Sequence, residues 1–370
     1  MNTNSAEEVL VDCRSVWKIF GDRAPAAMQA YRERGLSKKQ ILQDFGCVVG
    51  VSDVSLQVRR GEIFCIMGLS GSGKSTLIRL LNRLITPTAG EVLVKGKDIA
   101  RLDTATLREV RAKHIGMVFQ SVALLPHRTV LENAAFGLEV QGVGKAERHA
   151  VAERALAKVG LGDWVARYPD ELSGGMQQRV GLARAIASDP EVILMDEPFS
   201  ALDPLIRRQL QDEFRQLTKS LGKSAVFITH DLEEAIRIGD RIAIMKDGVI
   251  IQEGTAEEIV LSPADDYVAE FVAGISRLHL VKAHSIMTSP ADYRAAHPAV
   301  DLAALASASP QSDLDTLINL MVRCGQDALG IVQEGVVVGI VTQRDLLRGV
   351  QGSPASEGLE PSVTQLEKSL

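Results

Sequence analysis

The nine residues from Gly68 to Thr76 constrain this chain more than any other stretch. They read GLSGSGKST, which fits the pattern Gly-x-x-x-x-Gly-Lys-Ser/Thr, and they follow the apolar run Ile63 to Met67. Glycines allow a backbone to wrap closely around a phosphate group and to point its N–H groups inward. The order of strand, glycine-rich loop and helix therefore predicts a nucleotide site. The alternative is a chance Gly/Ser-rich turn before a helix.

Each part of this phosphate loop has an expected role. Lys74 should reach the β- and γ-phosphates, and the Ser75 hydroxyl should bind Mg²⁺. The helix that begins here turns its positive end toward the phosphates. The loop residues predicted to contact the nucleotide are Gly68, Ser70, Gly71, Ser72, Gly73, Lys74, Ser75 and Thr76. The loop alone does not identify which phosphate chemistry it serves.

Length and composition limit the other possibilities. At 370 residues, with 46% hydrophobic and 24% charged residues, the chain predicts a globular protein of two domains. A net charge of −6 gives no support to a nucleic-acid partner, and no apolar run is long enough to cross a membrane. We therefore expect a cytosolic chain. Its four cysteines form no C-x-x-C pair, so neither a disulfide framework nor a zinc site is expected.

The pattern of apolar runs predicts an α/β core. Short, fully apolar runs alternate with helical periodicity, as in a parallel sheet covered on both faces. The predicted core strands are Ile63 to Met67, Val192 to Met195, Ala225 to Thr229, Arg241 to Met245 and Val249 to Gln252. Residues from about 121 to 188 have a helical period and predict an inserted helical subdomain. Val9 to Phe20 alternates loosely and predicts an edge strand.

Two acidic residues follow one of these strands. Asp196 and Glu197 come directly after Val192 to Met195, and Pro198 fixes the chain beyond them. Asp196 can therefore reach a Mg²⁺ held by Ser75, while Glu197 can accept a proton from an attacking water. The alternative, an acidic surface turn, fits poorly with the apolar run.

A second glycine-rich stretch precedes a helix. Ser173, Gly174 and Gly175 lie in the run LSGGMQQR, where free N–H groups and a positive helix end favour an anion. The alternative is an ordinary helix N-cap at Ser173.

Together these motifs resemble the ATP-binding subunits of ABC transporters, over roughly Val9 to Gly274. The resemblance implies an ABC-type P-loop ATPase in which Gln120 contacts Mg²⁺ and the membrane partner, and His230 contacts the γ-phosphate. It also implies that Phe20 stacks on adenine and that Asp203 belongs to the D-loop at 200–203. Taken singly, Gln120 could be a polar residue at a strand end, and His230 could merely precede a capping box.

The resemblance also implies how such a site works. Lys74, Glu197 and His230 are the expected catalytic residues, with ATP and Mg²⁺ as cofactors. In this family the signature of one copy covers the ATP of another, so Ser173, Gly174 and Gly175 would complete the site of a second copy. Met176 replaces the glutamine that many members have.

The segment from about 22 to 50 narrows the resemblance. Gly35 to Leu42 reads GLSKKQIL, similar to the insertion of the glycine betaine/proline, or quaternary amine, uptake subunits. Ser37 and Gln40 have capping-box spacing, and we expect a pair of short helices here. This resemblance implies osmoprotectant uptake and a peripheral position on the cytoplasmic face of the membrane. It also implies a permease partner and, indirectly, an extracytoplasmic solute-binding protein. The alternatives are an importer ATPase for another small solute, such as an amino acid, and a soluble ABC ATPase that does not act in transport.

Beyond Gly274 the sequence becomes rich in Ala, Ser and Pro, which predicts a domain boundary. Residues 275–351 should form a small α+β domain, because Gly339 to Leu346 resembles the end of a CBS motif. In nucleotide-binding CBS sites the Thr and Asp of that pattern face a ribose and phosphate. The segment is too short for two full repeats, so a packing or dimerising module without a ligand is the alternative. Residues 352–370 are polar and predict disorder.

Overall fold

The computed structural model describes residues 8–351. The chain divides into two compact units, Met1–Ala256 and Glu257–Leu370. This division precedes the boundary predicted at Gly274, because helices α10 (Ala256–Leu261) and α11 (Asp266–Val272) belong with the second unit. The Lys282 backbone N–H donates to Oε1 of Glu257 over 2.6 Å, which ties α10 to the residues beyond the predicted boundary. The tail predicted at 352–370 lies outside the described residues.

A six-stranded sheet forms the centre of the first unit. Its strand order is β10-β9-β3-β8-β7-β6. Neighbouring strands are parallel except at the edge pair of β9 and β10. The strands are β3 (Ile63–Met67), β6 (Ile115–Val118), β7 (Val192–Asp196), β8 (Ser224–Thr229), β9 (Arg241–Lys246) and β10 (Val249–Gly254). The predicted apolar runs are thus confirmed as strands.

Helices cover both faces of this sheet, as predicted. Ile66 packs in one core cluster with Leu77 of α3 (Lys74–Leu81). Phe227, on the opposite face, packs against Phe214 of α8 (Pro204–Ser220), with ring centroids 6.1 Å apart. Two further helices flank the strands, α4 (Thr104–His114), which the sequence analysis did not predict, and α9 (Leu232–Ile238).

A second, antiparallel sheet has the strand order β2-β1-β4-β5. Its strands are β1 (Val9–Phe20), β2 (Val48–Arg59), β4 (Ala89–Val94) and β5 (Lys97–Asp98). The prediction that Val9 to Phe20 forms an edge strand is wrong, because β1 pairs with β2 on one side and β4 on the other. Alternation of apolar and polar residues reports which face of a sheet is buried and says nothing about backbone pairing.

The insertion between β1 and β2 forms the predicted pair of helices, α1 (Ala24–Arg34) and α2 (Lys38–Phe45). The capping box is present: the Gln40 N–H donates to Ser37 Oγ over 3.3 Å, and the Ser37 N–H donates to Gln40 Oε1 over 2.8 Å. Met28 and Ile41 are buried in a small core of their own with Trp17. The insertion is therefore packed against the nucleotide-binding unit by its own apolar contacts.

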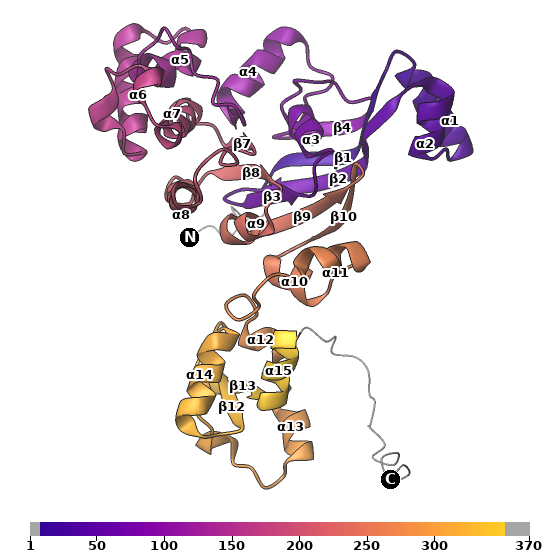
Figure 1. Cartoon of the computed structure of the whole chain (residues 1–370), viewed down its shortest axis with the longest axis vertical. Helices are drawn as coiled ribbons and strands as arrows, with labels where there is room; N and C mark the ends of the chain where they lie inside the picture. The colour runs from indigo at the N-terminus through magenta and orange to yellow at the C-terminus, as the bar shows by residue number, and fades with distance from the viewer. Residues whose placement is uncertain (1–7, 352–370) are drawn as a thin grey trace, which may run out of the picture. The chain divides into compact units, whose positions relative to one another are not determined.

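The helical subdomain consists of three main helices, α5 (Val130–Val140), α6 (Lys145–Lys158) and α7 (Gly174–Ala187), with two short 3-10 turns, η1 (Gly162–Trp164) and η2 (Pro169–Glu171). Figure 1 shows these helices gathered at one end of the first unit. α5 packs against both α6 and α7. The subdomain predicted for about 121–188 therefore forms as a helical body.

The second unit has a small three-stranded sheet with the order β11-β12-β13. Its elements after α11 are α12 (Ala283–Ile286), α13 (Pro290–Ala296), η3 (Leu302–Ala304), β11 (Ser307–Ala308), α14 (Leu314–Cys324), β12 (Ala328–Gln333), β13 (Val336–Thr342) and α15 (Gln343–Gln351). Leu314, Leu329 and Val341 are buried in one cluster. Among the described residues of the whole chain, no helix is long and apolar enough to span a membrane.

Candidate active site

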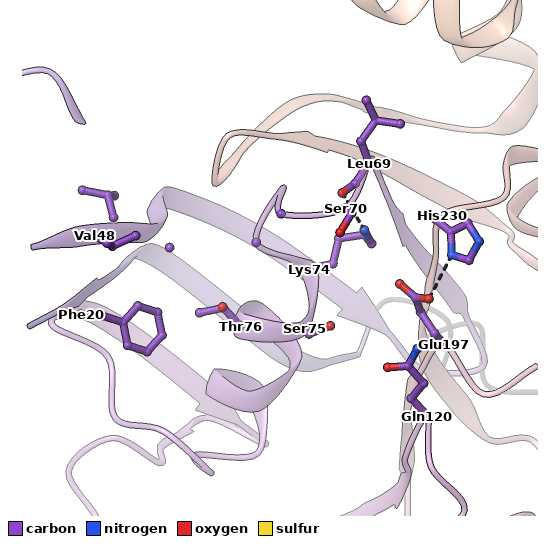
Figure 2. A pocket seen from close by; sticks show the side chains of 14 residues that line it. Phe20, Val48, Leu69, Ser70, Lys74, Ser75, Thr76, Gln120, Glu197 and His230 are labelled. Atoms are coloured by element: carbon purple, nitrogen blue, oxygen red, sulfur yellow. Dashed lines mark hydrogen bonds and ion pairs between the residues drawn. The ribbon is translucent and has the colours of Figure 1, made fainter. Parts of the chain in front are cut away.

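A cavity of about 730 Å³ lies at the phosphate loop. Figure 2 shows Phe20 and Val48 at one end, the loop with Lys74 in the middle, and Gln120, Glu197 and His230 at the other end. Six separate stretches of the first unit therefore contribute to one space. The residues that line it are Phe20, Val48, Val49, Gly50, Leu69, Ser70, Gly71, Gly73, Lys74, Ser75, Thr76, Gln120, Glu197 and His230.

The phosphate loop depends on glycine at two positions. Gly68 has a φ of +152° and Gly73 a φ of +104°, both in the region that side chains disfavour. A Cβ atom on Gly73 would lie 2.4 Å from the Gly50 carbonyl oxygen, and one on Gly68 would lie 2.1 Å from the Met245 carbonyl oxygen. One side of the loop is thus in close contact with neighbouring backbone, and its other side faces the cavity.

Lys74 begins helix α3 and is only 4% exposed. Its ammonium donates to the carbonyl oxygens of Gly68 over 2.7 Å and Leu69 over 3.0 Å. Burial lowers the pKa of Lys74, and the nearby charges of Glu197 and Asp196 act in the opposite direction. A cation in this position, beside a loop with free backbone N–H groups, fits a polyphosphate.

A hydroxyl and a carboxylate meet beneath the cavity. Ser75 Oγ donates to Oδ1 of Asp196 over 2.9 Å, and Asp196 is 4% exposed at the end of β7. Hydroxyl and carboxylate oxygens are the donors that Mg²⁺ prefers, and Mg²⁺ commonly takes the rest of its shell from phosphates and water. The described residues hold no cluster of three or more His, Cys, Asp or Glu side chains for a metal. The pair fits a Mg²⁺ that a bound nucleotide completes.

Glu197 and His230 are joined directly. Nδ1 of His230 lies 2.9 Å from Oε2 of Glu197. Glu197 has a φ of +46°, a strained conformation for a residue with a side chain, and its N–H donates to the Ile228 carbonyl oxygen over 3.1 Å. The parallel pairing of β7 and β8 brings the two strand ends together. A carboxylate and an imidazole thus face the space beyond Lys74.

Gln120 and Phe20 occupy opposite ends of the cavity. Gln120 follows β6 and lies beside Glu197, whereas Phe20 ends β1 and is 40% exposed (Figure 2). Nζ of Lys18 lies 5.2 Å from the centroid of the Phe20 ring. An exposed aromatic face at one end and a polar end at the other suit a base at Phe20 and a phosphate chain running toward Gln120.

Four cavity residues were missed by sequence reasoning. Val48, Val49 and Gly50 were assigned to the insertion, and Leu69 is one of the unspecified positions of the phosphate-loop pattern. The exposed apolar side chains of Val48, 55%, and Leu69, 57%, border the cavity. No local signal marked Gly50, because it lies within β2 and reaches the cavity only through the packing of β2 against the loop.

Other predicted site residues do not line the cavity. Ser173 caps α7 by accepting from the Met176 N–H over 3.4 Å, and Asp203 caps α8 by accepting from the Leu205 N–H over 2.9 Å. Gly174 and Gly175 open α7 and are also absent from the lining. Ser72 belongs to the phosphate loop, but its Oγ is buried and has no hydrogen-bond partner among the described residues.

The fold and the cavity define an α/β protein of the P-loop nucleotide-binding class. A family model described as "ABC transporter" matches residues 51–200. The chain is 55% identical to the glycine betaine/proline betaine transport system ATP-binding protein ProV of Salmonella typhimurium, over 75% of this chain and 69% of that protein. It is 45% identical to the trimethylamine N-oxide transport system ATP-binding protein TmoW of Ruegeria pomeroyi, over 91% and 96%.

Solved structures agree with this family. A dimeric ATP-binding cassette in a post-hydrolysis state, bound to ADP and Pi, is similar with a TM-score of 0.56 and 32% identity. The match covers 66% of this chain and 98% of that one. The chain therefore belongs to the ABC transporter family, and it is an ATP-binding subunit of the ATPase type.

Proposed function

We propose that this chain hydrolyses ATP to drive the uptake of glycine betaine, proline or a related quaternary amine. The cavity carries the proposal, because it gathers Lys74, Glu197 and His230 around a space that suits a nucleotide. The transport names of the relatives and the insertion at about 22–50 support the solute class. Nothing in the cavity would contact the transported solute, so the solute would be selected by other subunits.

The residues have distinct roles in this proposal. Ser75 and Asp196 would hold Mg²⁺ together with Gln120, and the metal would supply positive charge to the phosphates. Lys74 would stabilise charge on the γ-phosphoryl group. Glu197 would accept a proton from the attacking water, and His230 would orient Glu197 through the 2.9 Å contact and reach the γ-phosphate.

A second copy of the chain would complete the site. The N–H groups of Ser173, Gly174 and Gly175 at the start of α7 have no hydrogen-bond partner within the described part of the chain. These residues do not line the cavity of their own chain. The sequence has one phosphate loop and one signature. Two copies in opposite orientation would place each signature over the other's ATP, with Asp203 near the junction, so hydrolysis would need two subunits to meet.

The membrane permease would dock in a groove between α4, β6 and the helical subdomain. This groove has a volume of about 640 Å³ and is lined by Met117, Phe136 and Val140, with Val140 72% exposed. Arg108 and Arg111 lie along the same groove. A permease segment with apolar and acidic side chains would suit it. Through this contact the subunit would be held at the cytoplasmic face of the membrane.

The second unit would be a CBS-like regulatory or dimerisation module. Thr342 Oγ1 donates to Oδ2 of Asp345 over 2.7 Å, and the Asp345 N–H donates to Thr342 Oγ1 over 3.2 Å. This pair caps α15, so a ribose or phosphate would have to compete with the cap. The exposed Val322 and Leu347, 77% and 62%, favour packing against another chain over ligand binding.

Uptake assays test the proposed solute. The complete transporter, with its permease and solute-binding protein, would be reconstituted in vesicles and supplied with labelled glycine betaine, proline, choline or carnitine. We expect ATP-dependent uptake of at least one of them and none with the Glu197→Gln variant. Uptake of an ordinary amino acid alone would favour the alternative importer. Copurification with DNA or ribosomes, and with no permease, would favour a soluble ATPase outside transport.

A further inference from the structure

Lys38, the first residue of α2 in the insertion, holds an unusual position. Its Nζ atom is buried and has no hydrogen-bond partner among the described residues. Burial lowers the pKa of Lys38, and the negative charge of Asp247 acts in the opposite direction. A buried ammonium without a hydrogen-bond partner is costly, even where a nearby carboxylate offsets part of its charge.

The ammonium lies behind the phosphate loop. A Cβ atom added to Gly248 would lie 3.2 Å from Nζ of Lys38 and 2.8 Å from the Gly50 carbonyl oxygen. The Gly248 N–H donates to the Ser72 carbonyl oxygen over 2.8 Å, and the Gly248 carbonyl oxygen accepts from the Ser52 N–H over 2.8 Å. Lys38 therefore adjoins a glycine whose backbone hydrogen-bonds to both the phosphate loop and β2.

The same glycine touches the start of α3. A Cβ atom on Gly73 would lie 3.3 Å from the Gly248 Cα atom and 2.4 Å from the Gly50 carbonyl oxygen. Gly50 and Gly73 both line the nucleotide cavity. The Gly248 backbone, and next to it the Gly50 and Gly73 backbone, thus lie between the Lys38 ammonium and the space for the phosphates. The Met245 methyl group packs beside Gly73, where a Cβ atom would lie 3.0 Å from it. Peptide groups and a methyl group carry no net charge, so the field of the ammonium reaches across them.

We propose that Lys38 is a positioning residue of the ATP site, whose positive charge, only partly offset by Asp247, is compensated by the phosphates of bound nucleotide across the Gly50, Gly73 and Gly248 backbone. The insertion would then have a role beyond packing, since it delivers a second cation to the phosphate loop besides Lys74. Its capping box at Ser37 and Gln40 fixes the start of α2 and with it the direction of Lys38. This inference rests on the ATP site proposed above.

The proposed role and a purely structural role of Lys38 predict different effects of Lys38→Met on the Tm of the nucleotide-free protein. Lys38→Met keeps most of the side-chain stem and removes the charge. If the Lys38 charge is only partly compensated without nucleotide, this change leaves the Tm of the nucleotide-free chain unchanged or raises it, because it removes a buried charge that has no hydrogen-bond partner. If Lys38 merely braces the turn at Gly248, the same change lowers that Tm.

The experiment compares full-length wild type, Lys38→Met, Lys38→Arg and Lys39→Met. Lys39 is the matched control, since it is the next residue of α2 and is exposed. Tm would be measured without nucleotide and with the slowly hydrolysed analogue adenylyl-imidodiphosphate plus Mg²⁺, and kcat and KM for ATP would be measured separately. We expect Lys38→Met to raise KM about five-fold at an unchanged kcat and to shrink the nucleotide-induced rise in Tm. Lys38→Arg should keep the KM and the nucleotide-induced rise in Tm at their wild-type values, because it keeps the positive charge. Lys39→Met should match wild type in every measurement.

Two results would overturn the inference. One is a lower nucleotide-free Tm for Lys38→Met with a normal nucleotide-induced shift, which would make Lys38 structural. The other is wild-type behaviour of Lys38→Met in every measurement. Failure of the ATP site itself is distinguishable, because wild type would then show neither hydrolysis nor a nucleotide-induced shift.

Discussion

His230 Nδ1 lies 2.9 Å from Oε2 of Glu197, although the two residues are far apart in the sequence. Each follows the end of a strand in the six-stranded sheet, β7 for Glu197 and β8 for His230. The parallel pairing of these strands fixes the contact. A carboxylate oriented by an imidazole, at the edge of a nucleotide cavity, is suited to take a proton from water.

Glu197→Gln should abolish turnover and leave ATP binding intact. The amide cannot accept the proton, so we expect kcat to fall about 1,000-fold, while the chain still binds ATP and accumulates as a dimer. Steady-state hydrolysis and size-exclusion chromatography with ATP measure the two effects. Glu233→Gln, on the exposed side of α9, is the control and should behave as wild type. Normal hydrolysis by Glu197→Gln would refute its assignment as the base.

His230→Ala should lower kcat about 100-fold with little change in nucleotide affinity. The imidazole contacts one oxygen of Glu197 and would reach the γ-phosphate only in the transition state. Its loss would therefore destabilise the transition state and leave the affinity for ATP almost unchanged. Titration with a fluorescent ATP analogue and single-turnover hydrolysis separate the two quantities. An equal loss of affinity and turnover would instead make His230 a binding residue.

Asp196→Asn should raise the Mg²⁺ concentration that hydrolysis requires. The change removes the charge that faces Ser75 Oγ across 2.9 Å, and with it the protein's main attraction for a divalent cation there. We expect the Mg²⁺ concentration for half-maximal activity to rise about ten-fold or more, and EDTA to abolish wild-type turnover. Undiminished wild-type hydrolysis in EDTA would exclude Mg²⁺ from the mechanism.

Gly73→Ala should damage the phosphate loop far more than Gly61→Ala. Both glycines have positive φ, so both changes incur backbone strain of about 1 kcal/mol or more. Only at Gly73 does the new Cβ also collide with the Gly50 carbonyl oxygen, at 2.4 Å, because Gly61 has open space. We expect Gly73→Ala to lower the Tm more than Gly61→Ala does, and we expect only Gly73→Ala to abolish ATP binding. Equal effects of the two changes would mean that the close approach is unimportant.

Glu191→Gln should reduce the acid sensitivity of folding. Burial raises the pKa of Glu191, but hydrogen bonds from Lys95, Arg60 and His114 outweigh it and lower that pKa to about 2. Because the folded pKa is depressed from 4.5, the stabilisation is fully present above about pH 4.5 and is lost as pH falls toward about 2.

The free energy of unfolding of Glu191→Gln should therefore be lower at pH 7 and should depend less steeply on pH between about 4.5 and 2. Urea denaturation at a series of pH values measures both effects. Glu153→Gln, exposed on α6, is the control. An unchanged pH dependence in the Glu191 variant would show that the contacts of Glu191 with Lys95, Arg60 and His114 do not contribute to the acid sensitivity of folding.

The sequence by itself determined the parts of this protein that depend on local order. Ile63–Met67 followed by the glycine-rich loop predicted β3 and the start of α3, and the capping box at Ser37 predicted α2, because strand, turn and cap chemistry are properties of neighbouring residues. The apolar run before Asp196 and Glu197 led to the expected role of Glu197 as a base. Family resemblance, carried by motif order, led to the expected role of His230 and to the class of transporter.

Only the tertiary structure decided which surfaces meet. The pairing of β1 on both sides, the place of Val48 and Gly50 at the cavity, and the exclusion of Ser173 from it follow from contacts between distant segments. So does the position of the Lys38 ammonium behind the phosphate loop. The periodicity of apolar residues along a chain predicts which side of a helix or strand is buried. It does not predict which other element packs against that side, because that depends on contacts between segments that are distant in the sequence.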